Sequence, residues 1–271
     1  MSIKKIQIKA PGYHDMFSVS TGGLENLTVL EINEKTIVIE APAHITATMP
    51  NVIIKSASVL TKVDALIITH SDADHIAGLD SLIWHKLFGE NSRLLLITHK
   101  EVAKQLWQRI STAFETDRVD GKTPRDFDHY VEFIELKLGE TTYINHLGIK
   151  IESFKRSTKH APFLSIAFRV LQKGTLLIAY SGDTSFDPEL IEFLVKGENH
   201  PVIHEVGSYT VGSTSHTHIE ELLTLPKDIQ ARMFINHIPI SLEEMIRRRI
   251  KEEKSPIRFA NELKNIKMKR K

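Results

Sequence analysis

Two histidines and two aspartates stand within six consecutive positions of the chain. They belong to the run Ala65-Leu-Ile-Ile-Thr-His-Ser-Asp-Ala-Asp-His-Ile-Ala-Gly-Leu79, in which an apolar strand is expected to end and a helix to begin. The four residues are His70, Asp72, Asp74 and His75. A tight turn after a rigid strand can aim all four at metal cations, and we therefore predict a metal site. The alternative is that the aspartates cap the helix and the histidines are solvated.

This run resembles the metal-binding signature of the metallo-β-lactamase superfamily, which is His-x-His-x-Asp-His after an apolar strand. Asp72 stands at the place of the second histidine, as in the similar motif of the hydrolase domain of DNA-uptake channel proteins. A carboxylate in place of an imidazole makes the site harder and weakens its preference for zinc over manganese or iron. The resemblance implies two divalent metal ions, with Zn²⁺ as the first expectation and Mn²⁺ or Fe as alternatives.

Three further residues match the remaining ligands of that superfamily in chain order, and each lies next to an apolar run. The resemblance implies His70, Asp72 and His160 for one ion, Asp74, His75 and His237 for the other, and Asp183 as the bridge. Two cations about 3.5–4 Å apart need such a shared anionic ligand, and a bound cation lowers the pKa of a water to about 7. The resulting hydroxide is the expected nucleophile.

The second half of the chain indicates which branch of the superfamily this sequence resembles. Its segments around Asp183, His216 and His237, and the pair His204-Glu205, resemble the ribonuclease Z branch. In that branch a histidine–glutamate pair is followed by a histidine that helps to protonate the leaving oxygen, an arrangement that penicillin-hydrolysing members do not share. The catalytic set that the resemblance implies is Asp74, His204, Glu205 and His216.

A protonated imidazole held by a carboxylate suits phosphodiester cleavage, because the reaction expels an alkoxide and a general acid accelerates it roughly 10²–10⁴-fold. We assign His216 as the acid and Glu205 as the group that orients it. The first alternative is that His218 is the acid. The second is that His204 and Glu205 only cap a strand end and that His216 is a polar loop residue.

Glu40 closes an apolar run and stands where relatives often have an aspartate that supports the metal ligands. A carboxylate that receives the ring hydrogen of a ligand histidine fixes its tautomer. The alternative is a charged strand end exposed to water. His44, four positions on, could line the pocket or be a solvated loop residue.

The composition fits one large hydrolase domain over residues 1–271. Of the 271 residues 41% are hydrophobic, and no linker or repeat marks a boundary. The absence of cysteine excludes a disulfide scaffold and leaves nitrogen and oxygen as metal ligands. The N-terminal segment lacks the apolar stretch of a signal peptide, and no run approaches the ~20 apolar residues of a membrane helix. We therefore expect a cytoplasmic protein with no membrane partner.

Apolar runs predict strands that alternate with amphipathic helices. The predicted strands are Ser2 to Ala10, Leu27 to Ile32, Thr36 to Glu40, Ala65 to Thr69, Leu94 to Thr98, Val131 to Leu136, Ile149 to Phe154, Leu164 to Leu171, Leu176 to Tyr180, Pro201 to Glu205 and Met233 to Asn236. The predicted helices are Ile76 to Leu87, Lys100 to Phe114, Pro188 to Val195, Ile219 to Thr224 and Leu242 to Glu253. This alternation suits an α/β fold, and the resemblance implies the four-layer αββα metallo-β-lactamase sandwich.

Positive charge is concentrated at the C-terminal end of a chain whose net charge is only +1. From Ser241 to Lys271 there are eleven Lys and Arg against five Glu, a net charge of +6, which leaves −5 for the rest. Arg247–Arg249 and Lys267–Lys271 could contact phosphates. The alternative is a solvated helix face and a frayed basic tail.

The chain lacks the glycine-rich basic arm with which ribonuclease Z enzymes grip transfer RNA, since Leu136 to His160 holds no such insertion. It is more similar to compact relatives that hydrolyse small phosphodiesters, including phage enzymes that degrade cyclic signalling nucleotides. We therefore predict a phosphodiesterase acting on a small nucleotide. The alternatives are a nuclease of RNA or DNA with salt-sensitive binding, a hydrolase of lactones, thioesters or β-lactams, and a nucleotide-binding sensor.

The insertion from Trp84 to Gly139 is expected to contribute to specificity and assembly. In its helix the residues Val102, Leu106, Ile110 and Ala113 share one face, which suits core packing, with a subunit interface as the alternative. Close relatives are commonly dimers, so the resemblance implies a homodimer. The candidate base-stacking residues are Phe127, Tyr130, Phe163 and Tyr209.

Overall fold

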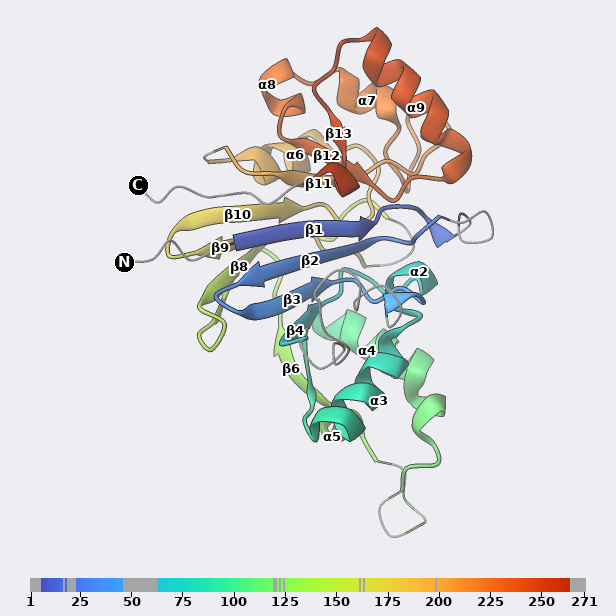
Figure 1. The fold of residues 1–271 in the computed structure, drawn as a ribbon, viewed down its shortest axis with the longest axis vertical. Helices are drawn as coiled ribbons and strands as arrows, with labels where there is room; N and C mark the ends of the chain where they lie inside the picture. The colour runs from blue at the N-terminus through green and yellow to red at the C-terminus, as the bar shows by residue number, and fades with distance from the viewer. Residues whose placement is uncertain are drawn as a thin grey trace.

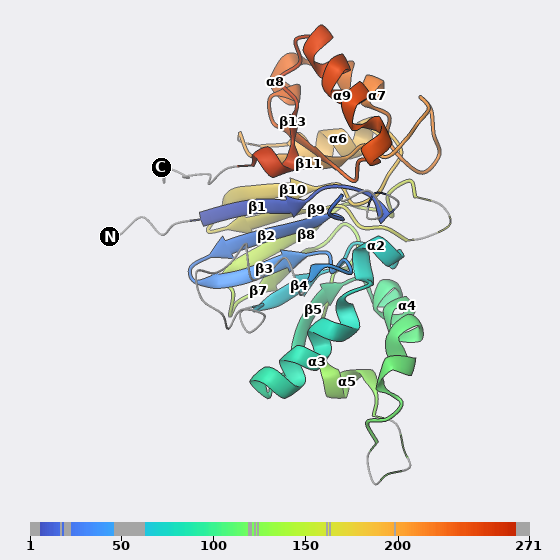
Figure 2. The ribbon, with the colours of Figure 1, turned by 45° about the vertical axis from the view of Figure 1, so that its right-hand side comes forward.

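Two β-sheets packed face to face form the centre of the molecule (Figure 1). The computed structural model describes residues 6–16, 18, 23–45, 63–118, 121, 123, 125–160, 162, 164–197 and 199–263. The apolar core between the sheets takes buried side chains from both, such as Ile37 and Ile97 from the first and Val170 and Ile178 from the second. Helices cover the outer face of each sheet, so the molecule has four layers (Figures 1 and 2).

The first sheet contains six strands that follow one another in chain order. They are β1 (Ile6–Gly12), β2 (Leu27–Ile32), β3 (Lys35–Ile39), β4 (Ala65–Ile67), β5 (Leu94–Thr98) and β6 (Val131–Glu135). The strands β1 to β3 pair antiparallel and β3 to β6 pair parallel. Parallel sheets are normally covered on both faces, and every side chain of β4 and β5 is accordingly buried.

The second sheet contains seven strands in the order β13-β12-β11-β10-β9-β8-β7. They are β7 (Thr141–Ile144), β8 (Ile149–Ser153), β9 (Phe168–Gln172), β10 (Thr175–Tyr180), β11 (Val202–Glu205), β12 (Met233–Asn236) and β13 (Arg258–Phe259). The strands β7 to β10 pair antiparallel and β10 to β13 pair parallel. In both sheets the parallel half therefore delivers several strand ends to one edge.

Two outer apolar clusters hold the helices against the sheets. On the first sheet lie α3 (Leu79–Glu90), α4 (Lys100–Ile110) and α5 (Phe127–Tyr130), at the bottom of Figure 1. On the second lie α6 (Pro188–Val195), α7 (Ile219–Leu223), α8 (Lys227–Gln230) and α9 (Ile240–Glu252), at the top. The short α2 (Ala73–Ile76) and the 3₁₀ turns Ser111–Phe114 and Ala260–Glu262 complete the fold. Within the described part of the chain, no helix has the length and apolar content to cross a membrane.

The αββα architecture predicted from the sequence is confirmed, but some boundaries differ. The strand predicted from Leu164 begins only at Phe168, because the residues before it bind two other loops: Ile166 N donates to Thr69 O at 3.1 Å, and Ala167 O accepts from Phe154 N at 2.8 Å. The start of the strand predicted from Ser2 lies outside the described residues. The short elements β7, β13, α5 and α8 are additional to the prediction.

The helix predicted from Ile76 to Leu87 is interrupted, and α3 begins after Gly78. Gly78 N donates to Ala41 O at 2.8 Å, and a Cβ at this position would lie 2.4 Å from Pro42 O. Only glycine allows this close approach of the two backbones. Because the two backbones touch at this break, the segment that carries His70 to His75 is held against the end of β3.

The helix predicted from Lys100 to Phe114 becomes a 3₁₀ turn after Ile110. The tighter winding of a 3₁₀ turn, 3.0 residues per turn, rotates the last residues relative to the α-helical face. The prediction that Ala113 shares the apolar face of this helix is therefore wrong. Ala113 is exposed, and Phe114 is buried in its place. Val102, Leu106 and Ile110 pack in the core beneath the first sheet, as core packing requires.

A buried polar network joins the two halves of the molecule next to the loop edge. The Tyr180 hydroxyl accepts hydrogen bonds from Asn26 Nδ2 at 2.8 Å and from Asn236 Nδ2 at 3.3 Å, and Asn236 Nδ2 also donates to Asn26 Oδ1 at 2.8 Å. Burial and the nearby carboxylates of Glu40 and Asp183 raise the pKa of Tyr180, which keeps it neutral. The network fixes the ends of β10 and β12.

We expect Tyr180→Phe to lower the free energy of unfolding by about 1–3 kcal/mol, because it leaves buried amide hydrogens without an acceptor. Urea denaturation followed by circular dichroism measures the change. Tyr143→Phe on β7 is the matched control, since Tyr143 is 69% exposed and should tolerate the change. Equal stability of the two variants would show that the network contributes nothing.

Candidate metal centre

The histidine and aspartate candidates follow strands of both sheets and meet at one edge of the sandwich. His70 and Asp72 follow β4, and Asp74 and His75 lie on α2. The other three candidates, listed in chain order, are His160 between β8 and β9, Asp183 after β10 and His237 after β12. The structure therefore brings together all seven residues predicted as ligands.

The first group consists of His70, Asp72 and His160, whose ligand atoms lie close enough to share an ion. Asp72 Oδ2 lies 3.1 Å from His160 Nε2 and 3.7 Å from His70 Nε2. Ligands about 2.0–2.2 Å from a tetrahedral cation lie about 3.4 Å from one another. The observed separations agree with that geometry.

The second group consists of Asp74, His75 and His237. Asp74 Oδ2 lies 2.9 Å from His237 Nε2 and 3.6 Å from His75 Nε2. His237 has a positive φ of 55°, an uncommon conformation for a residue other than glycine, which the turn after β12 imposes. This backbone conformation costs free energy, and the surrounding structure must hold it in place at this candidate ligand.

Asp183 lies between the two groups. Its Oδ2 is 3.6 Å from His70 Nε2, 3.5 Å from His75 Nε2 and 3.2 Å from His237 Nε2. Among the described residues, His70 Nε2, His75 Nε2 and Asp183 Oδ1 are buried without a hydrogen-bond partner. Buried polar atoms are rarely left unsatisfied. Two cations bridged by Asp183 would satisfy all three.

Glu40 lies behind the two histidines of the first motif and is fully buried, so the alternative of a solvated strand end is wrong. Its Oε1 accepts the Thr69 hydroxyl at 2.6 Å, and Thr69 Oγ1 lies 2.9 Å from His70 Nδ1. The same Oε1 lies 3.4 Å from His75 Nδ1. Glu40 thus holds the His70 ring through Thr69, while its contact with the His75 ring is electrostatic. Sequence reasoning missed the part that Thr69 plays, although its position beside His70 is the signal that could have found it.

The surroundings shift the pKa values of the histidines in this cluster in opposite directions. Burial and the charge of His75 lower the pKa of His70 to about 3. For His237, burial opposes the charged form, but the carboxylates of Asp183 and Asp74 outweigh it and raise the pKa to about 10. Burial likewise opposes the ionised form of Asp183, and the surrounding imidazoles still hold its pKa well below the usual range. The Asp183 carboxylate is therefore ionised.

Glu205 at the end of β11 ties the bridging aspartate to the loop that carries His216. Its carboxylate accepts backbone hydrogen bonds from Thr184 N at 3.1 Å, Thr217 N at 2.8 Å and Gly207 N at 2.8 Å. Its Oε2 lies 3.5 Å from His216 Nδ1, which is 4.0 Å from Asp183 Oδ2. The His216 side chain is 26% exposed, so it can reach a bound ligand.

The structure does not bring His204 into the cluster. Side chains alternate along a strand, and Ile203 points into the core between the sheets, so His204 points toward the helices. Its Nδ1 lies 2.8 Å from the carbonyl oxygen of Glu205, and burial lowers its pKa, which keeps it neutral. His218 caps α7, where its Nδ1 accepts from Glu220 N at 3.3 Å. The geometry therefore favours His216 over His218 as the acid.

The remaining candidates make other contacts. His44 Nδ1 is 3.5 Å from Glu25 Oε2. Tyr130 is buried in the core with Phe127 packed against it, while Tyr209 is 63% exposed and its hydroxyl lies 2.7 Å from Ser241 Oγ. The prediction for Phe163 and that for Lys267–Lys271 fall outside the described residues.

The fold and the site together define a metal-dependent hydrolase of the metallo-β-lactamase fold. The chain is similar to the metallo-β-lactamase fold protein YhfI from Bacillus subtilis, with a TM-score of 0.70 and 16% identity over 97% of this chain and 98% of that one. It is also similar to the short form of human tRNase Z, with a TM-score of 0.64 and 15% identity over 88% and 94% of the two chains.

The chain belongs to the Anti-Pycsar protein Apyc1 family, whose sequence model matches residues 12–264. The relative of that name from Paenibacillus sp. (strain J14) is 29% identical over 185 residues, which cover 67% of this chain and 71% of the relative.

We expect metal binding to release protons and to strengthen as the pH rises. A metal binds neutral imidazole, whereas His237, with a pKa of about 10 in the metal-free protein, is protonated at pH 7. Each pH unit below 10 should therefore weaken the affinity by up to about tenfold. Calorimetric titration with Zn²⁺ in buffers of different ionisation enthalpy measures the protons released. His146→Ala, which removes an exposed histidine of the β7–β8 turn, is the control. An affinity that does not change with pH would contradict the expectation.

Proposed function

We propose that this protein hydrolyses the phosphodiester bond of a cyclic nucleotide and yields the linear monophosphate. The observation that carries the proposal is the placement of His216 beside Glu205 and Asp183, where Asp183 lies between two groups that could each hold a cation. A phosphodiester needs both a strong nucleophile and a proton for the departing alkoxide. Membership in a family whose proteins degrade cyclic nucleotides supports the same substrate class.

When two divalent cations are bound, they supply a hydroxide near neutral pH and offset the charge of the phosphate. We infer that Zn²⁺ is the physiological ion, held by imidazole nitrogen and carboxylate oxygen, with Mn²⁺ or Fe as alternatives because Asp72 hardens the first site. Asp183 would be the ligand that the two ions share, and Glu40 would support the ligand rings from behind.

The proton transfer falls to His216. Attack on phosphorus forms one P–O bond and breaks one ester P–O bond, so the ring opens while both oxygens remain on the same sugar. The imidazolium of His216 donates its proton to the departing oxygen, and the Glu205 carboxylate beside Nδ1 stabilises the charged ring. Glu205 itself is kept in place by three backbone amides.

A nuclease function has less support. Arg247 and Arg249 of α9 are engaged by glutamates: Arg247 binds Glu243, and Arg249 binds Glu220 and Glu253. Paired arginines attract phosphates less than free ones, because the partner carboxylate cancels their charge. We further propose that the protein acts as a homodimer in the cytoplasm, in line with the dimers common among relatives.

Chromatographic product analysis with cyclic mononucleotides and unprocessed transfer RNA tests the proposal. We expect conversion of a cyclic nucleotide to the linear monophosphate, loss of activity with chelator, and recovery with Zn²⁺ or Mn²⁺. Asp183→Ala should abolish turnover and bound metal, measured by mass spectrometry, while Asp128→Ala on the exposed end of α5 should change neither. Cleavage of the transfer RNA alone would overturn the proposed substrate class.

We expect the effect of His216→Ala to depend on the leaving group. The variant should lower kcat for a cyclic nucleotide by roughly 10²–10⁴-fold. It should lower kcat much less for bis(p-nitrophenyl) phosphate, whose nitrophenolate needs no proton to depart. The metal content should stay at the wild-type level. An equal loss on both substrates would remove the general-acid assignment and leave His216 as a structural residue.

A further inference from the structure

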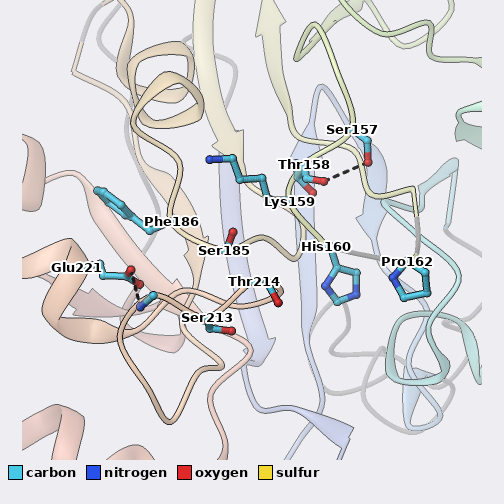
Figure 3. A pocket seen from close by; sticks show the side chains of 11 residues that line it. Ser157, Thr158, Lys159, His160, Pro162, Ser185, Phe186, Ser213, Thr214 and Glu221 are labelled. Atoms are coloured by element: carbon cyan, nitrogen blue, oxygen red, sulfur yellow. Dashed lines mark hydrogen bonds between the residues drawn. The ribbon is translucent and has the colours of Figure 1, made fainter.

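A cavity of about 660 Å³ opens beside His160 (Figure 3). Small-molecule sites commonly have volumes of roughly 300–1,000 Å³. In Figure 3, Phe186 and His160 lie on opposite sides of the cavity, with Ser185 and Thr214 between them. The cavity is therefore large enough for a group the size of a nucleoside.

Three of the chain segments that line this cavity carry or adjoin the candidate reactive residues, and Glu221 of α7 completes the lining. One runs from Ser157 through the ligand His160, the second begins two residues after the bridging Asp183, and the third runs from Gly212 toward His216. The segments are bound to one another: Ser185 N donates to Lys159 O at 2.8 Å, and His160 Nδ1 lies 3.2 Å from the Ser215 carbonyl oxygen. A substrate with its phosphate at the cluster therefore has this cavity beside it.

Among the described residues of the cavity wall, Lys159 is a cation with only a loose ion pair. Glu221 is occupied, since its two carboxylate oxygens accept from Gly212 N at 3.1 Å and from His218 N at 2.8 Å. The Lys159 ammonium lies 3.8 Å from Asp187, too far for a hydrogen bond, and Asp187 is already bound by Arg156 at 2.7 Å. Lys159 can therefore turn to an acceptor on a ligand at little cost.

The polar and aromatic groups of the wall suit a nucleoside. Ser213 Oγ accepts from the backbone N–H groups of Ser215 and His216, both at 3.3 Å, which leaves its hydroxyl hydrogen to donate elsewhere. Phe186, which also packs against the outer apolar cluster of the second sheet, provides an apolar ring at the end of the cavity opposite His160. Aromatic faces bind nucleic acid bases by stacking, which is worth about 1–3 kcal/mol per base.

We propose that this cavity holds the nucleoside part of the substrate, with Phe186 against the face of the base and Lys159 donating to an acceptor on the base. Ser213 donates to the sugar, which lies between the base and the phosphate. The inference rests on the proposed cyclic-nucleotide hydrolysis and assigns the residues that bind the substrate rather than cleave it.

Steady-state kinetics of Lys159→Ala and Phe186→Leu test this assignment. For each variant we expect KM for a cyclic nucleotide to rise about tenfold with kcat nearly constant, because the removed contact binds the substrate and the transition state alike. The ratio of kcat/KM on the nucleotide to kcat/KM on bis(p-nitrophenyl) phosphate, which has no base, should fall by the same factor. Lys155→Ala is the matched control, since this exposed lysine pairs with Glu189 and does not line the cavity.

The two variants act on different parts of the wall, so the test does not depend on the folding of one of them. Wild-type turnover with an unchanged KM in both variants would overturn the assignment and leave the proposed function intact. A loss of equal size on both substrates would mark the residues as structural and also overturn it. Absence of nucleotide turnover by the wild-type protein would overturn the proposed function itself.

Discussion

The loop edge of the sandwich is organised by the need to neutralise closely spaced carboxylates away from water. Asp74 and Asp183 are buried, and both face the Nε2 atoms of His75 and His237. Burial of a charge is costly unless it is paired. Imidazolium groups pair these carboxylates in the metal-free protein, and divalent cations do so with twice the charge. The strand ends at this edge therefore contribute both the carboxylates and the imidazoles that pair with them.

That the candidate ligands meet at one edge could be predicted from the sequence, because most of them follow a short apolar run and the carboxyl ends of neighbouring parallel strands lie together. The same rule failed for His204, which belongs to a strand end but points to the other face. Only the register of β11 against β12, which pairs His204 with Ile235, decides that direction. Sequence spacing also could not separate His216 from His218. Their difference comes from the start of α7, where His218 serves as the cap.

The support of the site depends on long-range backbone contacts that no sequence pattern contains. Glu205 accepts the amides of Thr184 and Thr217 from two other segments, in addition to the local amide of Gly207. The carboxylate was predicted as an orienting group for one histidine, and the structure shows that it also closes the loops around the bridging aspartate. The cavity beside His160 has the same origin, since its walls come from segments that approach only in the folded chain.

Glu40 has a positive φ of 68°, and its Oε1 faces Thr69 Oγ1 and His75 Nδ1 at the same time. Through Thr69 it supports His70, a ligand of the first group, and directly it supports His75, a ligand of the second. Both groups therefore depend on one side chain, and a change at Glu40 would disturb the ligand candidates of both together.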